Sequence, residues 1–188
     1  MKKFTAIFLA ALMAFSFAAC GSKETGKTEE TVTITDSLEL LNTVLGGYDE
    51  ADLFPVAGGD SANINFEGPG KFDATNADEL DVTLGFPSAN VDKIDDAASM
   101  MNAMMANNFT AGAFRVTDNA NVETVASDLK DNILARQWMC GMPEKVVVIS
   151  VGNYVVSAFG LTDILDTFTT ELSEAYPSAT VLYDEAVM

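Results

Sequence analysis

Residues 146–156 read VVVISVGNYVV, two runs of β-branched and aromatic residues on either side of the pair Gly152-Asn153. Such runs are typical of strands, and Gly-Asn supplies the positive φ angles that a two-residue hairpin turn needs. Tyr154 opens the second run with an aromatic side chain that can pack across the strand pair. We therefore predict two neighbouring antiparallel strands joined by a tight turn.

Helical patterns flank this hairpin on both sides. Before it, between an Asp118-Asn119 turn and the stops Gly141 and Pro143, apolar residues recur at helical spacing: Val122, Val125, Ala126, Leu129 and Ile133. After it, a second helix is predicted from Thr162, a good N-cap residue, to Pro177, and its apolar face consists of Ile164, Leu165, Phe168, Leu172 and Tyr176. Residues 111–116 and 180–183 are predicted to be strands.

The element order over residues 110–184 is therefore strand, helix, strand, strand, helix, strand. This is the split β-α-β plan of ferredoxin-like domains, in which a four-stranded antiparallel sheet carries both helices on one face. We expect residues 32–109 to be mostly helix and loop and to cover the other face. They are predicted to contain a helix over Asp36–Leu45, turns at Gly58-Gly59 and Gly68-Pro69-Gly70, a short helix over Asn76–Leu84 and a helical segment over Val91–Met105. Residues 32–188 are thus predicted to form a single α+β domain.

Residues 1–19 have the pattern of a signal peptide. Lys2 and Lys3 precede an apolar run that is shorter than the ~20 residues of a membrane span. The order Phe17-Ala18-Ala19-Cys20 then looks like a bacterial lipobox, although an aliphatic residue is more usual than Phe17. An ordinary secreted protein and a transmembrane anchor are the alternatives. We predict cleavage before Cys20 and lipidation of its thiol.

Lipidation of Cys20 predicts where the protein works. The diacylglyceryl group that a lipobox implies would hold the chain stably at the cell membrane, because two acyl chains bind a bilayer far better than one. Residues 20–31 would form a flexible linker, since none of the residues after the cysteine is large and apolar. The expected location is the extracytoplasmic face of the cell membrane. The membrane itself is the expected partner of the lipid on Cys20.

Charge and composition exclude several functions. The chain has 10 Lys and Arg against 28 Asp and Glu, a net charge of -18, which disfavours nucleic acid and an anionic membrane surface as partners. It has no histidine, which excludes a Ser-His-Asp triad, a Cys-His pair and a His-based zinc site. If Cys20 is lipidated, Cys140 cannot form an intramolecular disulfide, and we expect it to be a small buried hydrophobe.

Three stretches carry a resemblance to a known family: Phe114–Asp118, Arg136-Gln137 and Gly152–Val155. Together they resemble small lipoproteins of Gram-positive, clostridial-type bacteria, over roughly residues 76–160. That family is a domain of unknown function. The resemblance therefore implies a lipoprotein and transfers no catalytic, cofactor-binding or metal-binding residue. Thr110 departs from the family pattern, in which an acidic residue is expected just before the strand.

Acidic residues gather in three places: Asp49-Glu50 with Asp52, Asp78-Glu79 with Asp81, and Asp92 with Asp95-Asp96. Calcium prefers such oxygen ligands, but a solvated acidic face is the simpler interpretation. The nearest approach to an EF-hand, over residues 63–68, has Ala74 where a closing glutamate is required. Paired carboxylates can also hydrolyse glycosides, although nothing in the sequence selects a pair.

Four methionines, Met100, Met101, Met104 and Met105, lie in the predicted helical segment. At helical spacing beside Val91 and Ile94 they are expected to form a packed face. A partner-binding surface and a copper(I) site are the alternatives, because methionine is adaptable and thioethers bind copper(I).

The function predicted from the sequence is a non-enzymatic binding or interaction module, tethered outside the cell membrane through Cys20. We expect no catalytic residue, cofactor or metal, and a partner that is an envelope protein or a small ligand. A scaffold or spacer subunit of an envelope complex and a carboxylate-based hydrolase are the alternatives.

Overall fold

The computed structural model describes residues 33–139 and 141–187. The predicted signal peptide (1–19), Cys20, the linker (20–31) and Cys140 lie outside these residues. In chain order the helices, helical turns and strands are α1 (Ser37–Gly47), β1 (Val56–Ala57), β2 (Gly70–Phe72), α2 (Ala77–Glu79), η1 (Leu80–Leu84), η2 (Ser88–Lys93), β3 (Ile94–Asn102), η3 (Ala106–Asn108), β4 (Phe109–Val116), η4 (Asn119–Asn121), α3 (Val122–Leu134), β5 (Lys145–Val151), β6 (Tyr154–Gly160), α4 (Thr162–Ala175) and β7 (Thr180–Ala186). The fold is α+β, as predicted.

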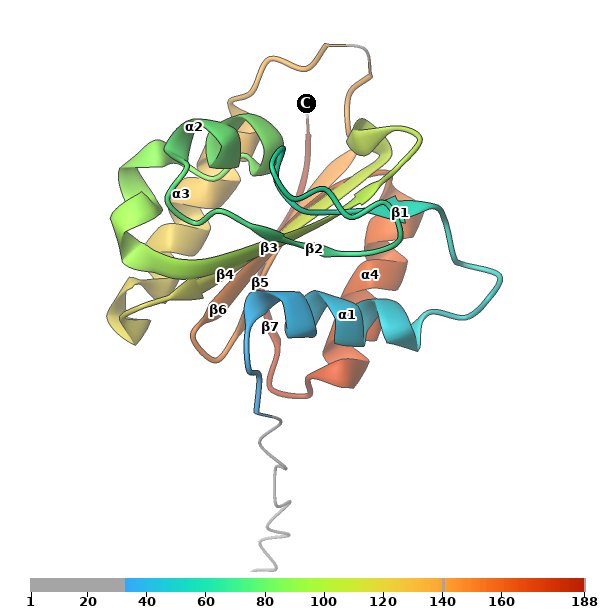
Figure 1. Ribbon diagram of the computed structural model, residues 1–188, viewed down its shortest axis with the longest axis horizontal. Coiled ribbons are helices and arrows are strands. Elements are labelled where there is room, and N and C mark those ends of the chain that lie inside the picture. Colours follow the sequence, from blue (N-terminus) through green and yellow to red (C-terminus); the bar gives the residue numbers. More distant parts are fainter. Residues whose placement is uncertain (1–32, 140, 188) are drawn as a thin grey trace, which may run out of the picture.

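Seven strands form one sheet, and each pair of neighbours is antiparallel. The order across the sheet is β1-β3-β4-β6-β5-β7, and β2 also pairs with β3. β1 and β2 lie end to end along the outer edge of β3, because β1 pairs with residues 101–102 and β2 with residues 97–99. Helices cover both faces of the sheet (Figure 1).

The C-terminal half has the predicted element order. The hairpin is present, with Val151 opposite Tyr154 and Gly152 at a φ of 59°. Both predicted helices are present as α3 and α4. Thr162 is the first residue of α4 and not its N-cap; its backbone N–H donates to the Glu144 carboxylate at 3.0 Å, so a residue outside the helix satisfies this orphan donor.

The prediction that both helices lie on one face is wrong. α4 packs with α1 on one face of the sheet through Leu165, Phe168 and Leu172. α3 packs on the opposite face through Val125, Leu129 and Ile133. The strand order differs from the ferredoxin-like plan as well, since β7 pairs with β5 and not with β4.

The cause is β3, which the sequence predicted as part of a helical segment over Val91–Met105. Residues 32–109 are therefore not mostly helix and loop, because they contribute β1, β2 and β3 to the sheet. β3 occupies the free edge of β4, so β7 can join only at β5. The crossovers β4-α3-β5 and β6-α4-β7 then both move towards the β7 edge of the sheet. Their first strands, β4 and β6, run antiparallel to each other. With the usual right-handed connection, the two helices must lie on opposite faces.

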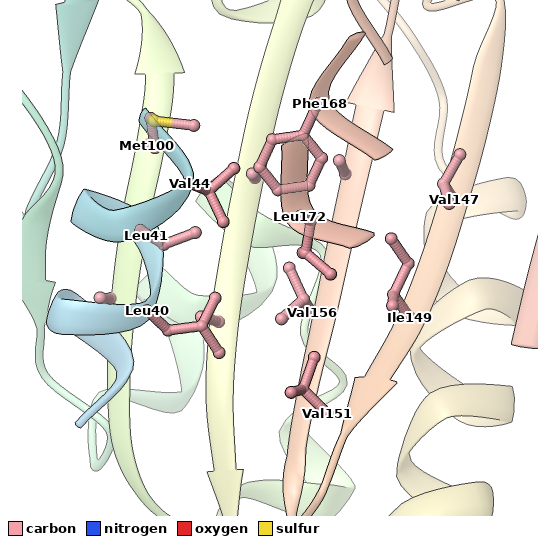
Figure 2. Packing of buried hydrophobic residues seen from close by; sticks show 14 of the residues in the cluster. Leu40, Leu41, Val44, Met100, Val147, Ile149, Val151, Val156, Phe168 and Leu172 are labelled. Atoms are coloured by element: carbon pink, nitrogen blue, oxygen red, sulfur yellow. The ribbon is translucent and has the colours of Figure 1, made fainter. Parts of the chain in front are cut away.

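The β-branched run of β5 supplies both cores. Val146 and Val148 face α3, whereas Val147 and Ile149 face α4, because successive strand residues point to opposite faces. Figure 2 shows the α1 and α4 side of the sheet, where Leu40, Leu41 and Val44 from α1 meet Met100, Phe168 and Leu172. A strand buried on both faces explains why this run is continuously apolar.

Candidate functional site: an apolar end face

The nine residues of β3 separate two ends of the domain. Asp36, which caps α1, and the start of β3 lie at one end, where Lys71 bridges Asp36 and Asp96. Met104 lies two residues beyond the last residue of β3 at the other end, roughly 30 Å away along the strand. In Figure 1 the described chain begins at the lower end, and the loops after β3 and α3 lie at the upper end.

The exposed large apolar side chains gather at the upper end. Seven of the nine in the described part of the chain lie on four segments there, and we call them the apolar end face: Ile64, Phe66, Val82, Met104, Met105, Met139 and Met142. Phe66 is 75% exposed and Met104 81%. Leu53 lies in the neighbouring loop before β1, and Val181 lies on β7 towards the other end. Large apolar patches on a soluble domain mark interaction sites more often than chance exposure.

A side chain at the end of β3 turns the methionines outward. The Asn102 side-chain oxygen accepts the backbone N–H groups of Met104 at 2.9 Å and Met105 at 3.1 Å. The preceding N–H, that of Ala103, donates to the Pro55 carbonyl at 2.8 Å. Because these three donors are satisfied, the chain leaves the sheet in a defined turn and the two side chains point away from the core.

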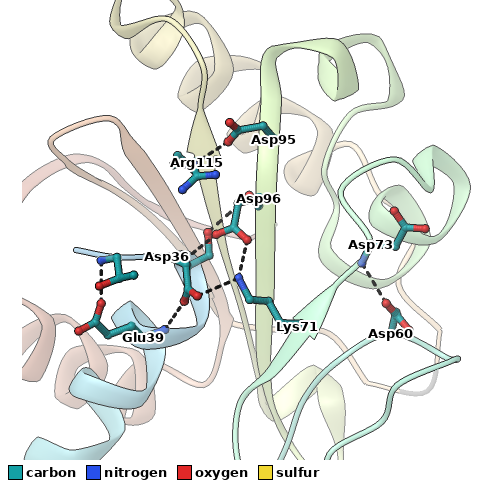
Figure 3. A network of polar contacts seen from close by, with 10 residues as sticks. Asp36, Glu39, Asp60, Lys71, Asp73, Asp95, Asp96 and Arg115 are labelled. Atoms are coloured by element: carbon teal, nitrogen blue, oxygen red, sulfur yellow. Dashed lines mark hydrogen bonds and ion pairs between the residues drawn. The ribbon is translucent and has the colours of Figure 1, made fainter.

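Asp60 organises the loop that presents Ile64 and Phe66. It is 5% exposed, and its Oδ1 accepts the backbone N–H groups of Ala62 and Asn63, both at 2.9 Å. Its Oδ2 accepts the N–H of Asp73 at 2.9 Å, as Figure 3 shows. This one carboxylate therefore joins the start of the loop to the chain after β2.

The third part of the face, the loop after α3, is fastened by Arg136 and Asn107. The Arg136 guanidinium donates to the Val82 carbonyl at 2.5 Å and lies over the rings of Trp138 and Phe159. Burial lowers the pKa of Arg136, although the negative charge of Asp81 acts to raise it. Asn107 donates from its side-chain amide to the carbonyl of Gly141 at 2.8 Å. These contacts bring Val82, Met139 and Met142 to the same end as Met104.

A groove of about 360 Å³ runs across this end. Its apolar lining includes Ile64, Phe66, Met101, Met104 and Met105. Its charged lining, within the described residues, consists of two acids and no Lys or Arg: Asp60 and Glu79. The Glu79 carboxylate accepts hydrogen bonds from the Ser61 backbone and the Asn76 amide, which are neutral donors. Among residues 33–139 and 141–187, no Lys or Arg forms a salt bridge with Glu79.

The prediction of a packed methionine face is correct for Met100 and wrong for Met104 and Met105. Met100 is fully buried under α1, because it points from a strand into the core. Met104 and Met105 lie beyond the strand, in the turn made by Asn102. The helical spacing that grouped these residues does not exist in the folded chain.

Two of the three predicted acidic clusters contribute side chains to structural contacts, whereas Asp49, Glu50 and Asp52 are exposed in the loop after α1. Asp95 pairs with Arg115 at 2.6 Å, and Asp81 accepts the Asn132 amide at 2.7 Å. Thr110, the departure from the family pattern, is buried and donates its hydroxyl to the Ala106 carbonyl at 3.0 Å. In residues 33–139 and 141–187 no group of three or more His, Cys, Asp or Glu side chains is arranged to hold a metal ion.

The other end of the domain carries a network of ion pairs around Lys71 (Figure 3). Lys71 lies 2.5 Å from Asp96 and 3.2 Å from Asp36. The buried Ser37 N–H donates to the second oxygen of Asp96 at 2.6 Å. Burial raises the pKa of Asp96, but the hydrogen bonds from Lys71 and Ser37 outweigh it and leave the pKa below its usual value. This network ties α1 to β2 and β3.

Comparison of the chain with protein-family models, curated proteins and solved structures finds no match. The resemblance to clostridial-type lipoproteins therefore stays a prediction. Within the described residues, no helix combines the length and the apolar character needed to cross a bilayer.

Ile64, Phe66 and Asp60 were not singled out from the sequence. One signal was available: the apolar pair stands in a turn-rich stretch between Gly58-Gly59 and Gly68-Pro69-Gly70. Large apolar residues in such a stretch have no regular element to bury them, which makes them candidates for an exposed surface.

Proposed function

We propose that this protein is an extracytoplasmic lipoprotein, anchored at the cell membrane through Cys20, whose domain is a non-enzymatic binding or interaction module. The apolar end face is its binding surface. The observation that carries the proposal is the concentration of seven exposed apolar side chains at one end, around a groove and on loops that polar contacts hold in place.

The position of this face fits a tethered protein. Asp36, the first capping residue after the linker, lies at the start of β3, and the face lies beyond the end of the same strand. A linker that joins the domain near Asp36 would leave the face directed away from the lipid anchor. The face would then be accessible to another component of the envelope.

Four carboxyl groups of the domain do not suit the acid role in glycoside hydrolysis. Hydrogen bonds from neighbouring residues lower the pKa values of Asp36, Glu39, Asp73 and Glu144. A carboxylic acid that donates a proton in glycoside hydrolysis needs a raised pKa. These four groups are adapted to accept hydrogen bonds in the fold.

The anchor is tested by the substitution Cys20→Ala. We expect the variant to appear in the medium or to remain unprocessed, whereas the parent chain fractionates with membranes as a processed protein. Normal processing and membrane retention of Cys20→Ala would overturn the lipid anchor.

The binding surface is tested by site-specific photo-cross-linking in intact cells. A photoreactive amino acid replaces Met104 in one variant and Val181 in a control variant, since both side chains are exposed but lie at opposite ends of the domain. We expect a discrete cross-linked product from position 104 that is absent from position 181. The same products from both positions, or none from either, would contradict a binding role for the end face and favour the scaffold or spacer alternative.

A further inference from the structure

We infer that the apolar end face takes a positively charged, amphipathic segment of another protein. This inference rests on the proposed function and specifies the chemistry of the partner. Its two requirements are apolar side chains that enter the groove and basic side chains that meet the acids around it.

The apolar requirement follows from the extent of the face. The groove takes side chains against Ile64, Phe66, Met104 and Met105, but Val82, Met139 and Met142 lie outside its lining. A small molecule that filled the groove would leave these three exposed. A protein segment can cover both parts, and methionine-rich surfaces adapt to such partners because the side chain is flexible and polarisable.

The basic requirement follows from the charges at this end. Glu79 and Asp60 line the groove, and they belong to a chain with 28 acids against 10 basic residues. Three basic residues lie at or next to this end, and each is engaged. Lys71, which lines a neighbouring pocket with Asp60 and Glu79, pairs with Asp36 and Asp96. Arg136 is half-buried against Trp138 and bonded to Val82, and Lys145 bridges Asp166 and Asp184. The field at the groove is negative, which selects for cationic partners.

The same charges count against three other occupants. A second copy of the chain would bring together two molecules of net charge -18, and like charges across an interface are unfavourable. An anionic membrane surface is repelled for the same reason. The linker of this chain, residues 21–31, contains no large apolar residue to enter the groove.

The test uses the chain's single tryptophan as a reporter. Trp138 lies beside Met139, with its ring 5.1 Å from that of Phe159. The full lipidated chain is placed in phosphatidylcholine vesicles, and energy transfer is measured from Trp138 to an acceptor dye on synthetic peptides without tryptophan. Three peptides of about 18 residues, five helical turns, share the same leucine positions and carry Lys, Gln or Glu at all the others.

We expect the Lys peptide to bind at least about tenfold more tightly than the Glu peptide, with affinity that falls as salt is added. The double substitution Phe66→Asp/Met104→Asp should weaken binding of the Lys peptide by about tenfold or more, because it removes two apolar anchors. Glu79→Gln keeps a hydrogen-bond acceptor for Ser61, and should weaken the Lys peptide about two- to fivefold without weakening the Gln peptide. Val181→Asp is the matched control and should leave binding unchanged.

Two results would overturn the inference, and they are distinguishable. If the three peptides bind equally and the double substitution abolishes all binding, the face binds partners but does not select basic ones. If the double substitution changes binding no more than Val181→Asp does, the face is not the binding surface, and the proposed function fails with the inference.

Discussion

The two ends of β3 use polar residues in different ways. At the end near Asp36, charged groups pair with each other, and Lys71 joins α1, β2 and β3 through Asp36 and Asp96. At the other end, Asn102, Asn107 and Asp60 mostly accept from or donate to the backbone of loops. The first arrangement fastens elements to the sheet. The second holds loops whose apolar side chains remain exposed. Because these loops are fixed by hydrogen bonds, the exposure is part of the fold and does not result from loose packing.

Two methionines four residues apart give the largest expected contrast between core and end face. Met100→Ala should lower the free energy of unfolding by about 2–5 kcal/mol, because it opens a cavity under α1. Met104→Ala should change it by less than about 0.5 kcal/mol, since the side chain is 81% exposed. Urea denaturation of both variants measures the difference. Equal losses would show that Met104 is packed and would remove it from the end face.

Lys71→Met breaks the network at the opposite end and should cost about 1–2 kcal/mol, because Asp96 loses its cation in a partly buried site. The methionine keeps most of the apolar stem of the lysine, so the loss reports the charge. Thermal unfolding near neutral pH provides the measurement. A change below the error of the method would mean that the ion pairs do not fasten α1.

The pH dependence of the same variant has a definite sign. The pKa of Asp96 is lowered in the fold because the hydrogen bonds from Lys71 and Ser37 outweigh burial, so its contribution is present above the ordinary value of 3.8 and is lost as the pH falls through the folded pKa. Burial lowers the pKa of Lys71, but the hydrogen bonds and charges of Asp96 and Asp36 outweigh burial and leave the pKa above its usual value of 10.5. The contribution of Lys71 to stability is therefore lost as the pH rises through this raised pKa. The advantage of the parent chain over Lys71→Met should therefore be greatest between these values and smaller outside them. Unfolding curves of both proteins at about pH 3, 7 and 11 test this linkage.

Asn102→Ala should have a smaller effect, about 1 kcal/mol, because it removes the acceptor for two backbone N–H groups in a solvent-exposed turn. Asn102→Asp is the matched control, since it keeps an acceptor oxygen. Hydrogen exchange of Met104 and Met105 should accelerate in the alanine variant and not in the aspartate variant. Unchanged exchange in both would show that the turn does not depend on this side chain.

The smallest stability change is expected at the end face itself. Phe66→Asp/Met104→Asp should alter the free energy of unfolding by no more than about 0.5 kcal/mol, because both side chains are mostly in water. The same variant should bind an environment-sensitive hydrophobic dye less than the parent chain does, whereas Val181→Asp should not. Dye binding that is equal in all three proteins would place the accessible apolar surface elsewhere.

The C-terminal half could be predicted from the sequence because its signals are local. The Gly152-Asn153 turn, the helical spacing in α3 and α4, and the β-branched run of β5 each depend on residues close in the chain. β3 could not be predicted in this way. Its residues Ala97, Ala98 and Met100 favour helix in isolation, but they are buried between layers that belong to distant parts of the chain. Tertiary packing overrode the local preference.

The candidate site shows the same division. The methionines after β3 were candidates in the sequence, but their predicted role depended on a helical segment. In the structure this segment is a strand followed by a turn. Phe66 and Val82 gave no periodic signal and join Met104 only in the fold. Asp60 is one acid among 28 in the sequence, and its role as the centre of a loop becomes visible only from its hydrogen bonds.

The sequence by itself determined the acidic character, the absence of histidine chemistry, and the hairpin and helices of the C-terminal half. It also predicts an anchor at Cys20. Only the tertiary structure decided which edge β7 joins, on which face each helix lies, and which apolar side chains remain in water. The first set depends on composition and on contacts between neighbours in the chain. The second depends on β3 pairing with β4. Because β3 occupies the edge of β4, β7 must join the sheet at β5, and the residues after β3 lead into the apolar end face.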